Sequence, residues 1–461
     1  MTVTEQVEQA AAAAAAAAES FGGMRPAERA GLLRDAASAL DDSADTLVPL
    51  AIEESHLPEG RLRGELKRTT FQLRLFAEVL EDGGYAEAII DHADPDWGMG
   101  PRPDLRRMLI PLGPAVVFSA SNFPFAFSVA GGDTASALAA GCPVVVKGHS
   151  GHPKLSERTA AVLTEVLPAG VLGLVSGVEA GKALVTDPRI KVGAFTGSES
   201  AGRALFDLAC GRPDPIPFYG ELGSLNPVFV TEAAASARKD EIASGFVQSY
   251  TLGVGQFCTK PGLLFVPEGS GLPEAIERAA SEAGAAPLLN DRIADGFREV
   301  RDKLAATSGV SQPVAGQGSG LQESPSLFVT SYQEFRSQAD TLLTECFGPA
   351  SVVVTYADAA ELVDAARAFE GNLTATVHGE PEDYDSVRPL LAVLRDRAGR
   401  LLWNGWPTGV SVTYAMQHGG PWPATTASIH TSVGTTAIRR FLRPVSYQDM
   451  PAELLPEVLR D

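Results

Sequence analysis

The sequence predicts an α/β fold in which two open sheets, each wound with helices, form two domains. Short apolar runs alternate with amphipathic runs at helical spacing, a pattern typical of parallel sheets covered by helices. The alternation begins near residue 115 and begins again near Pro227. The chain has 461 residues, which is longer than most single domains, so we expect more than one domain.

The first 80 residues are expected to be helical, because apolar residues such as Leu33 and Leu40 recur at helical spacing. The alanine run at 10–18 has no basic segment before it, so it predicts a helix and not a signal peptide. A second, arginine-rich helical run extends from Arg61 to Leu80. Residues 84–107 are polar and contain Pro and Gly, which predicts an extended or hairpin connection.

Strands and helices then alternate twice along the chain. The strands expected in the first run are Ala115–Phe118, Val144–Val146, Val171–Ser176 and Val192–Phe195. The helices expected there are Ser128–Ala140, Lys154–Val166 and Ala201–Ala209. The strands expected in the second run are Val228–Val230, Leu263–Val266, Ser351–Tyr356 and Thr374–His378. Residues 306–325 are rich in Gly, Ser and Gln and are expected to form a surface loop.

Composition argues against several classes of protein. The formal net charge of −20 at pH 7 argues against a general affinity for nucleic acid or an anionic membrane. No apolar run reaches the roughly 18–20 residues that span a bilayer. The four cysteines are widely spaced and form no CxxC pair, so neither a zinc site nor a disulfide framework is indicated. We therefore expect a cytoplasmic protein with reduced thiols and no metal.

One cysteine lies in a loop that suits a nucleophile. Cys258 is flanked by Gly253, Gly255 and Gly262, and glycine allows tight turns and close approach of backbone to a ligand. Backbone N–H groups around such a thiol would stabilise a thiolate or an oxyanion. The alternative is a buried, inert cysteine in a turn, which is what most free cysteines are.

Two further polar side chains lie next to expected strands. Glu221 precedes the strand at Val228–Val230, and partial desolvation there would raise its pKa towards that of a useful general base. Asn122 follows the strand at Ala115–Phe118, where α/β proteins place ligands and where an amide can donate to an oxyanion. The alternatives are a solvated loop carboxylate and an asparagine that caps the next helix.

A nucleotide site is indicated at two other strand ends, although the sequence has no GxGxxG motif. Thr196, Gly197 and Ser198 form a turn between an expected strand and an expected helix. The N–H groups at that helix start would point towards a phosphate. Lys147 ends another strand and is expected to bind ribose or phosphate.

Each of these signals is weak alone, but together they resemble the aldehyde dehydrogenase superfamily over essentially the whole chain. The positions that occur in the order and approximate spacing of that family are Asn122, Lys147, Phe195–Ser198, Glu221, Cys258 and Glu345–Pro349. The resemblance implies two Rossmann-like domains and an oligomerisation arm. It also implies an NAD(P)-dependent enzyme that oxidises an aldehyde to a carboxylate.

By this resemblance, each residue has an implied role. The Cys258 thiolate attacks the aldehyde carbon to give a thiohemiacetal, while the Asn122 amide and the Cys258 backbone N–H hold the oxyanion. Hydride passes to the nicotinamide and leaves a thioester, and Glu221 then activates the water that hydrolyses it. Glu345 would bind the nicotinamide ribose and Phe347 would support the ring. The residues expected beside the nicotinamide and the pyrophosphate are Thr196, Gly197 and Ser198.

Two departures from the family pattern affect the expected site. Many members have asparagine where this chain has Lys260, whose ammonium would either lower the thiol pKa or point outwards; we expect the second. NAD-preferring members usually have Lys-Pro-Ser-Glu where this chain has Lys147-Gly-His-Ser150. Because Ser150 carries no charge to repel a 2′-phosphate, and His149, Ser150 or His152 would add contacts, we expect NADP, with NAD as the alternative.

Four stretches resemble a closer subfamily, the α-ketoglutaric semialdehyde (2,5-dioxovalerate) dehydrogenases. They are Pro101–Met108, Ser128–Ala137, Trp403–Gly409 and His418–Ala424. The expected reaction is therefore the oxidation of 2,5-dioxopentanoate to 2-oxoglutarate. The alternatives are an NADP-dependent fatty or broad-range aldehyde dehydrogenase, a CoA-acylating aldehyde dehydrogenase and an inactive homologue. Glu221 disfavours the CoA-acylating enzyme, because a water-activating base serves hydrolysis.

A carboxylated substrate needs a cation where it is buried, and arginine offers it two parallel hydrogen bonds. Arg61, Glu65, Arg68 and Gln72 share one face of an expected helix, which borders the substrate tunnel in the family. Arg68 is the candidate for the substrate carboxylate, and the alternative is a surface ion pair between Arg68 and an acid such as Glu65. The apolar walls of the tunnel are expected from Phe123, Phe127, Phe257 and Trp406.

The expected domain limits follow from the same resemblance. Residues 1–227 would form the cofactor-binding domain, with 84–107 in the oligomerisation arm and 416–430 returning to this domain. Residues 228–415 would form the catalytic domain, and 431–461 a C-terminal oligomerisation segment. We expect a homodimer or homotetramer that binds a small-molecule aldehyde and neither nucleic acid nor membrane.

Overall fold

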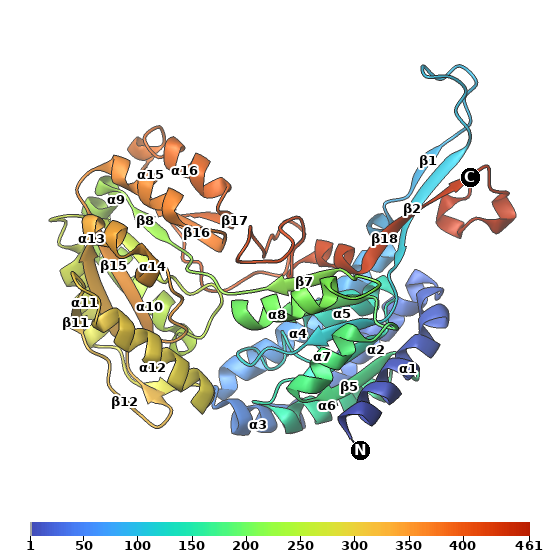
Figure 1. The fold of residues 1–461 in the computed structure, drawn as a ribbon, viewed down its shortest axis with the longest axis horizontal. Coiled ribbons are helices and arrows are strands. Elements are labelled where there is room, and N and C mark those ends of the chain that lie inside the picture. The colour runs from blue at the N-terminus through green and yellow to red at the C-terminus, as the bar shows by residue number, and fades with distance from the viewer. Residues whose placement is uncertain (1) are drawn as a thin grey trace.

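Two open sheets lie side by side along the long axis of the molecule (Figure 1). This computed structural model describes residues 2–461. The smaller sheet has five strands in the order β5-β4-β3-β6-β7, and all of them are parallel. The larger sheet has seven strands in the order β11-β14-β15-β9-β8-β16-β17, parallel except for β11. The predicted α/β fold with two Rossmann-like sheets is therefore confirmed.

The smaller sheet contains the four strands that the sequence predicts and one that it does not. Its strands are β3 (Ala115–Phe118), β4 (Val144–Gly148), β5 (Leu172–Ser176), β6 (Val192–Thr196) and β7 (Phe218–Glu221). The strand order reverses beside β3, and open α/β sheets bind ligands at such a point, outside the carboxyl ends of their strands. β7, which ends in Glu221, was missed because it is short and contains a glycine.

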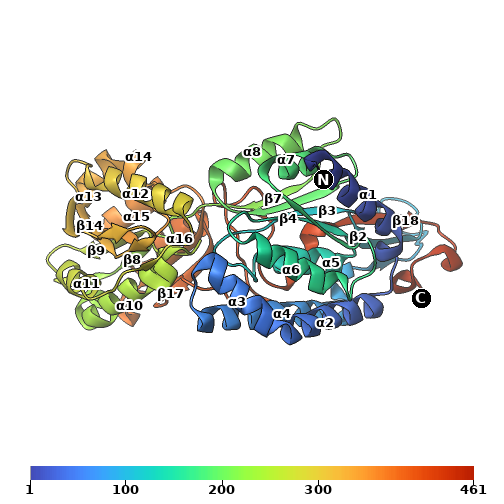
Figure 2. The ribbon, with the colours of Figure 1, turned by 90° about the horizontal axis from the view of Figure 1, so that it is seen from below.

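Helices cover both faces of the smaller sheet (Figure 2). On one face lie α2 (Pro26–Asp42), α3 (Ala44–Ser55), α4 (Glu59–Asp82), α5 (Gly132–Ala140) and α6 (Pro153–Thr164). On the other lie α1 (Val3–Gly22), α7 (Val178–Thr186) and α8 (Glu199–Cys210). The alanine run buries Ala11, Ala14 and Ala17 against the sheet side, as a helix. α5 begins four residues later than predicted, because Gly131 and Gly132 bond back to Ser128 and Ala126 in a tight turn.

The larger sheet begins directly after β7. Its strands are β8 (Val228–Val230), β9 (Leu263–Pro267), β11 (Ser311–Val314), β14 (Ser326–Ser331), β15 (Ala350–Tyr356), β16 (Asn372–His378) and β17 (Ala398–Trp403). Its helices are α9 (Glu232–Ala237), α10 (Lys239–Thr251), α11 (Leu272–Ser281), α12 (Asp291–Ala305), α13 (Tyr332–Ser337), α14 (Ala339–Leu342), α15 (Ala359–Ala368) and α16 (Arg388–Arg395).

The prediction of a surface loop at 306–325 is wrong in part. The segment contains β11 and two very short strands, β12 (Gly318–Ser319) and β13 (Gln322–Glu323). β11 pairs with β14, while β12 and β13 form a small sheet with β10 (Ala286–Pro287). Gly, Ser and Gln have weak intrinsic strand propensity, so here the pairing with partners elsewhere in the chain decides the structure.

A third sheet projects from the smaller one (Figure 1). It consists of β1 (Ile89–Asp91), β2 (Leu105–Pro111) and β18 (Leu442–Gln448), all antiparallel. The segment between β17 and β18 crosses back to the smaller sheet, where Leu222 donates to the Ala424 carbonyl. Among the helices of residues 2–461, none has the length and apolar character needed to cross a membrane.

Candidate active site

Four of the predicted site residues lie along one edge of the smaller sheet. The carboxyl ends of parallel strands meet at the same edge. Asn122 follows β3, Lys147 lies in β4, Thr196 ends β6 and Glu221 ends β7. The structure thus brings together residues that are spread over about a hundred positions of sequence, from 122 to 221.

Cys258 lies in the loop between η2 (Leu252–Gly255) and β9, which is a strand of the larger sheet. Gly253, Val254 and Gly255 all have positive φ, at 56°, 59° and 66°. That conformation is unusual for a β-branched residue, and such strain tends to cluster at functional sites. A side chain at Gly255 would lie 2.1 Å from the Gly348 carbonyl oxygen, so only glycine lets the loop pack against that turn.

The Cys258 thiol lies beside a buried pair of side chains. Cys258 Sγ is 3.6 Å from His418 Nε2, and the same nitrogen is 3.0 Å from Glu221 Oε1. The Ser432 hydroxyl donates to the second carboxylate oxygen of Glu221. One ligand atom from each of Cys258, His418 and Glu221 lies within 4.8 Å of the others. Glu221 and His418 are buried, while Cys258 keeps partial access to solvent.

The pKa shifts at this cluster differ from those that the sequence predicts. Burial and the adjacent Glu221 carboxylate raise the pKa of the Cys258 thiol well above its usual range. Burial also acts to raise the pKa of Glu221, but His418 and the Ser432 hydroxyl outweigh it and hold that pKa below its usual range. The predicted raised pKa of Glu221 is therefore wrong for this state, in which a thiol faces an ionised carboxylate. The expected stabilisation of a thiolate or an oxyanion by the N–H groups of the loop stays a prediction.

His418 and Ser432 are site residues that the sequence reasoning missed. The sequence predicted no role for either residue; His418 is only the first residue of the stretch His418–Ala424 that resembles the semialdehyde dehydrogenases. They are separated from Glu221 by 197 and 211 positions, so no local pattern links them. The one available signal was a histidine followed by two glycines in a segment expected to return to the smaller sheet.

Asn122 is oriented by the loop that carries the thiol. Its side-chain Nδ2 donates to the Gln256 backbone carbonyl at 3.0 Å, and its own backbone carbonyl accepts from Arg61 at 2.6 Å. The next helix, α5, has Gly131 and not Asn122 at its N-cap. The alternative role as a helix cap is therefore excluded, and the amide points towards the nucleophile loop.

An aromatic cluster with two arginines borders the same loop. Phe123 lies 5.4 Å from Phe127 and 5.1 Å from Phe257 between ring centroids. The Arg68 guanidinium lies over Phe123 and Phe127, and that of Arg61 lies over Phe123 and Phe257. Within residues 2–461, Arg68 Nε and Arg61 Nη1 are buried without a hydrogen-bond partner.

The predicted alternative of a surface ion pair for Arg68 does not hold. Glu65 is buried and accepts hydrogen bonds from the Phe125 and Ala126 backbone N–H groups. No salt bridge to Arg68 occurs in the part of the chain that the structure describes. Trp406 is not brought into this cluster, because its ring packs 4.5 Å from His378 on the larger sheet.

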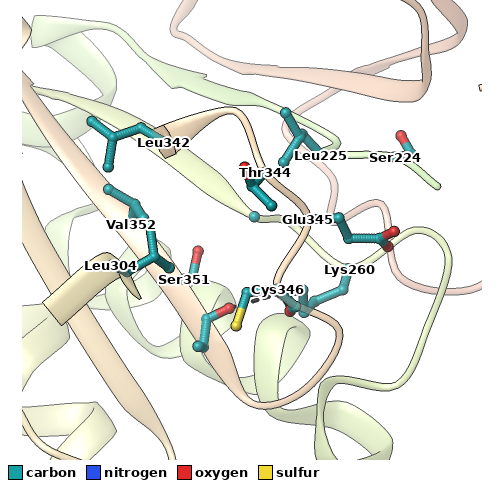
Figure 3. A pocket seen from close by; sticks show the side chains of 12 residues that line it. Ser224, Leu225, Lys260, Leu304, Leu342, Thr344, Glu345, Cys346, Ser351 and Val352 are labelled. Atoms are coloured by element: carbon teal, nitrogen blue, oxygen red, sulfur yellow. Dashed lines mark hydrogen bonds between the residues drawn. The ribbon is translucent and has the colours of Figure 1, made fainter. Parts of the chain in front are cut away.

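Lys260 is buried, so the prediction that it points outwards is wrong. Its Nζ donates to the Cys346 carbonyl at 2.6 Å and to the Ala350 carbonyl at 2.8 Å. Figure 3 shows Lys260 beside Cys346 and Glu345. A buried ammonium needs acceptors, and these two backbone carbonyls supply them in the interior, which allows this long side chain to turn inwards. Lys260 thereby fixes the turn that carries Glu345 and Phe347 against the nucleophile loop.

The turn after β6 and the Glu345 turn fit a dinucleotide. The Thr196 hydroxyl is buried without a partner among the described residues, and the Ser198 side chain does not cap α8, so the first N–H groups of that helix are open to a phosphate. Glu345 extends along the Gly223 backbone, where an added side chain would lie 2.5 Å from its carboxylate. Burial raises the pKa of Glu345 to about 7.

The segment after β4 presents cations and no carboxylate at position 150. Lys147 is half-buried and Ser150 is exposed. Arg292, at the start of α12, lies close enough for its charge to lower the pKa of both Lys147 and His149, although burial is the larger cause for each. Burial brings the pKa of His149 to about 3, so this side chain is neutral at physiological pH.

Comparison with known proteins identifies the class that this arrangement belongs to. Residues 2–422 match the model of the aldehyde dehydrogenase family. The chain is 47% identical over 468 residues to α-ketoglutaric semialdehyde dehydrogenase 2 of Azospirillum brasilense, covering 99% of this chain and 89% of that protein. It is 42% identical over 467 residues to α-ketoglutaric semialdehyde dehydrogenase of Acinetobacter baylyi, again covering 99% and 89%.

The fold comparison agrees with the sequence comparison. The structure is similar to 1-pyrroline-5-carboxylate dehydrogenase from Thermus with bound NAD, with a TM-score of 0.81 and 21% identity, covering 96% of this chain and 85% of that chain. The chain therefore belongs to the aldehyde dehydrogenase family, as the sequence predicted. It is an NAD(P)-dependent oxidoreductase that oxidises aldehydes.

Proposed function

We propose that this enzyme oxidises 2,5-dioxopentanoate to 2-oxoglutarate. The observation that carries the proposal is the pair Arg61 and Arg68, which keep buried, unpartnered guanidinium nitrogens over an aromatic cluster within residues 2–461. Leaving such donors unpaired costs about 1–3 kcal/mol each. A substrate carboxylate would satisfy them, and the two relatives that share most of the chain are named for this semialdehyde.

The reaction that we propose uses the residues at the junction of the two sheets. Cys258 Sγ forms a bond to the aldehyde carbon, and the oxygen becomes an oxyanion that the Asn122 amide and the Cys258 backbone N–H stabilise. Thr196 and Glu345 would hold a nicotinamide, which would accept the hydride from the former aldehyde carbon and so leave a thioester on Cys258. Glu221 then takes a proton from the water that attacks the thioester, which releases the acid and the thiol.

Replacing Arg68 with alanine tests the substrate assignment. We expect KM for 2,5-dioxopentanoate to rise roughly ten- to a hundredfold, on the order of 1.4–3 kcal/mol for one lost charged hydrogen bond. Turnover of the uncharged aldehyde hexanal should change little. Steady-state kinetics with both aldehydes measures the two effects.

Arg63→Ala is the matched control, because Arg63 lies on the same helix but is exposed and pairs with Glu59 and Asp45. It should leave both aldehydes unaffected. If the wild-type enzyme prefers long unbranched aldehydes to every carboxylated one, the semialdehyde assignment fails. The broad-range aldehyde reading would then replace it. An activity that requires CoA would instead favour the acylating alternative.

We further propose that the enzyme prefers NADP. Lys147 lies in the same segment as Ser150, which carries no charge, and Arg292 lies close enough to Lys147 for its charge to lower the pKa of that lysine. His149 is neutral and would add a hydrogen bond but no charge. Glu54 already accepts from the Lys154 and Leu155 N–H groups at the start of α6, so the extra phosphate would be bound by side chains and not by that helix start.

The cofactor proposal predicts a larger kcat/KM with NADP than with NAD. Ser150→Glu should shift the ratio towards NAD by about tenfold or more, or about 1.4 kcal/mol, because a carboxylate repels the 2′-phosphate. Ser150→Gln has nearly the same shape without the charge and should shift it much less. A wild-type preference for NAD of tenfold would exclude the proposal.

The remaining assignments concern assembly. We propose that the arm formed by β1, β2 and β18 joins subunits into a homodimer or homotetramer in the cytoplasm. β1 lies at the edge of its sheet, and the hairpin tip exposes Trp97 and Met99. An open strand edge and exposed apolar side chains are features that a second chain would cover. We assign cofactor binding to the smaller sheet and the nucleophile to the larger one.

A further inference from the structure

The active site contains a buried histidine for which the proposed reaction has no role. We propose that His418 is a positioning residue whose single Nε2–H is shared between the Glu221 carboxylate and the Cys258 thiolate, and that it thereby helps the thiol to lose its proton. This inference rests on the proposed roles of Cys258 and Glu221. It goes beyond them by adding a third group that acts before substrate binds.

The geometry leaves one nitrogen facing two partners. His418 Nε2 is 3.0 Å from Glu221 Oε1 and 3.6 Å from Cys258 Sγ. The other ring nitrogen, Nδ1, is buried and has no hydrogen-bond partner within residues 2–461. The imidazole therefore contacts the nucleophile and the carboxylate through the same atom, unlike a triad in which the second nitrogen binds the orienting acid.

The position of the proton on the ring follows from these contacts. A protonated ring would bury a second N–H at Nδ1 without a partner, so we take the imidazole as neutral, with one N–H. If that proton were on Nδ1, a buried donor would be unpaired and a lone pair on Nε2 would face an ionised carboxylate. If the proton is on Nε2, it donates to Glu221 and only an acceptor lone pair stays unpaired. Because the second arrangement avoids both penalties, we assign the Nε2–H tautomer to the resting enzyme.

Ionisation of the thiol then becomes an exchange of partners. The proton on Cys258 Sγ moves to the Glu221 carboxylate, which has an oxygen within 4.8 Å of the sulfur. As Glu221 becomes neutral and Cys258 becomes negative, the Nε2–H changes its acceptor from Oε1 to Sγ. The imidazole keeps its own proton throughout. Glu221 passes the thiol proton on to water before it acts as the base in deacylation, and this is the proton that aldehyde oxidation releases overall. The N–H always donates to the partner that carries the charge.

Several anchors hold the imidazole in this position. The His418 N–H donates to the Thr431 hydroxyl oxygen, and the His418 carbonyl accepts from the Ser432 hydroxyl, which also binds Glu221. The segment is therefore tied to the carboxylate at two points. The other charged groups near the thiol are Glu221, Glu345, Arg68 and Arg400. They stay in place when only His418 is changed.

The test is the pH dependence of Cys258 alkylation by iodoacetamide in the free enzyme. His418→Phe and His418→Leu remove the donor, and both should move the inflection of the rate at least one pH unit higher, because the thiolate loses a hydrogen bond. At pH 7.5 the rate should fall about tenfold. His418→Gln keeps an N–H donor and should recover part of the rate. Affinity for NADP, measured by fluorescence, should change less than twofold.

His430→Phe is the matched control. His430 is half-buried and meets Tyr219 edge to face, and its ring makes no hydrogen bond to Cys258 or Glu221 among the described residues. It should reproduce the wild-type alkylation profile. If His418→Phe or His418→Leu also reproduces that profile, His418 only packs and the proposal is overturned. Alkylation needs no aldehyde, so a wrong substrate assignment leaves this test unaffected.

A measurement on the unmodified protein guards against variants that do not fold. Nitrogen NMR of ¹⁵N-histidine-labelled enzyme distinguishes the two imidazole tautomers, and the His418 signals are the ones missing in His418→Gln. We expect the Nε2–H tautomer in the resting enzyme. An Nδ1–H tautomer would place a lone pair towards both partners and would overturn the proposal.

Discussion

Replacing Cys258 with serine is expected to reduce dehydrogenase turnover by roughly 10⁴-fold or more, as the loss of a covalent nucleophile does elsewhere. A serine hydroxyl ionises far less readily than a thiol and forms no thioester, so the covalent route is lost. Affinity for the cofactor should remain, because the cofactor residues lie on other segments. Absorbance of the reduced cofactor and fluorescence titration measure these two quantities.

The matched control for this variant is Cys210→Ser. Cys210 is the exposed cysteine at the end of α8, whereas Cys142 and Cys346 are buried. Its replacement should leave turnover unchanged. If Cys258→Ser retained near-native kcat, the thioester route would be wrong. If both variants lost activity together, the loss would reflect a disturbed fold and not the nucleophile.

Glu221→Gln is expected to separate the two halves of the reaction. Glutamine keeps the shape and can still bond Ser432 and His418, but it cannot take a proton from water, so deacylation should slow by roughly 10²–10⁴-fold. Reduced cofactor should appear in a burst of about one equivalent per site, followed by a slow phase. The burst should be slower than the first wild-type turnover, because the variant also lacks the acceptor for the Cys258 proton, but it should still be faster than deacylation. Stopped-flow absorbance resolves the burst from the steady state.

Glu179→Gln serves as its control, since Glu179 is exposed on α7 and pairs only with Lys182 among the described residues. That variant should show wild-type kinetics without a burst. Unchanged steady-state turnover in Glu221→Gln would remove Glu221 as the base. If the burst were lost together with steady-state turnover, Glu221 would be needed mainly for ionisation of the Cys258 thiol, before hydride transfer. Our inference about His418 also gives Glu221 a part in that ionisation.

The sequence predicted the strands and site residues that depend on residues close together in the chain. Apolar runs such as Val144–Val146 and Val192–Phe195 mark strands, and the residue after each such strand reaches the shared edge of the sheet. Asn122 and Thr196 were found in this way. β7 was missed because Phe218–Glu221 is short and its pairing with β6 is decided by the sheet.

The features that the sequence did not predict depend on contacts between distant segments. Lys260 turns inwards because the Cys346 and Ala350 carbonyls lie within its reach, about ninety residues away. The pKa of Glu221 is lowered because His418 and Ser432 meet it from a segment about two hundred residues further on. Burial alone would raise the pKa of Glu221, so the residues next to Glu221 in the sequence do not reveal that its pKa is lowered.

The strand ends and the nucleophile loop belong to different sheets, and His418 is on a third segment that crosses between them. No single folded unit therefore contains the whole reaction centre. Activity therefore requires the two halves of the molecule to be docked against each other as well as folded. Warming or mild denaturant that loosens this junction would abolish activity while the helices and strands persist. The midpoint of inactivation, in temperature or denaturant concentration, therefore need not equal the midpoint of unfolding.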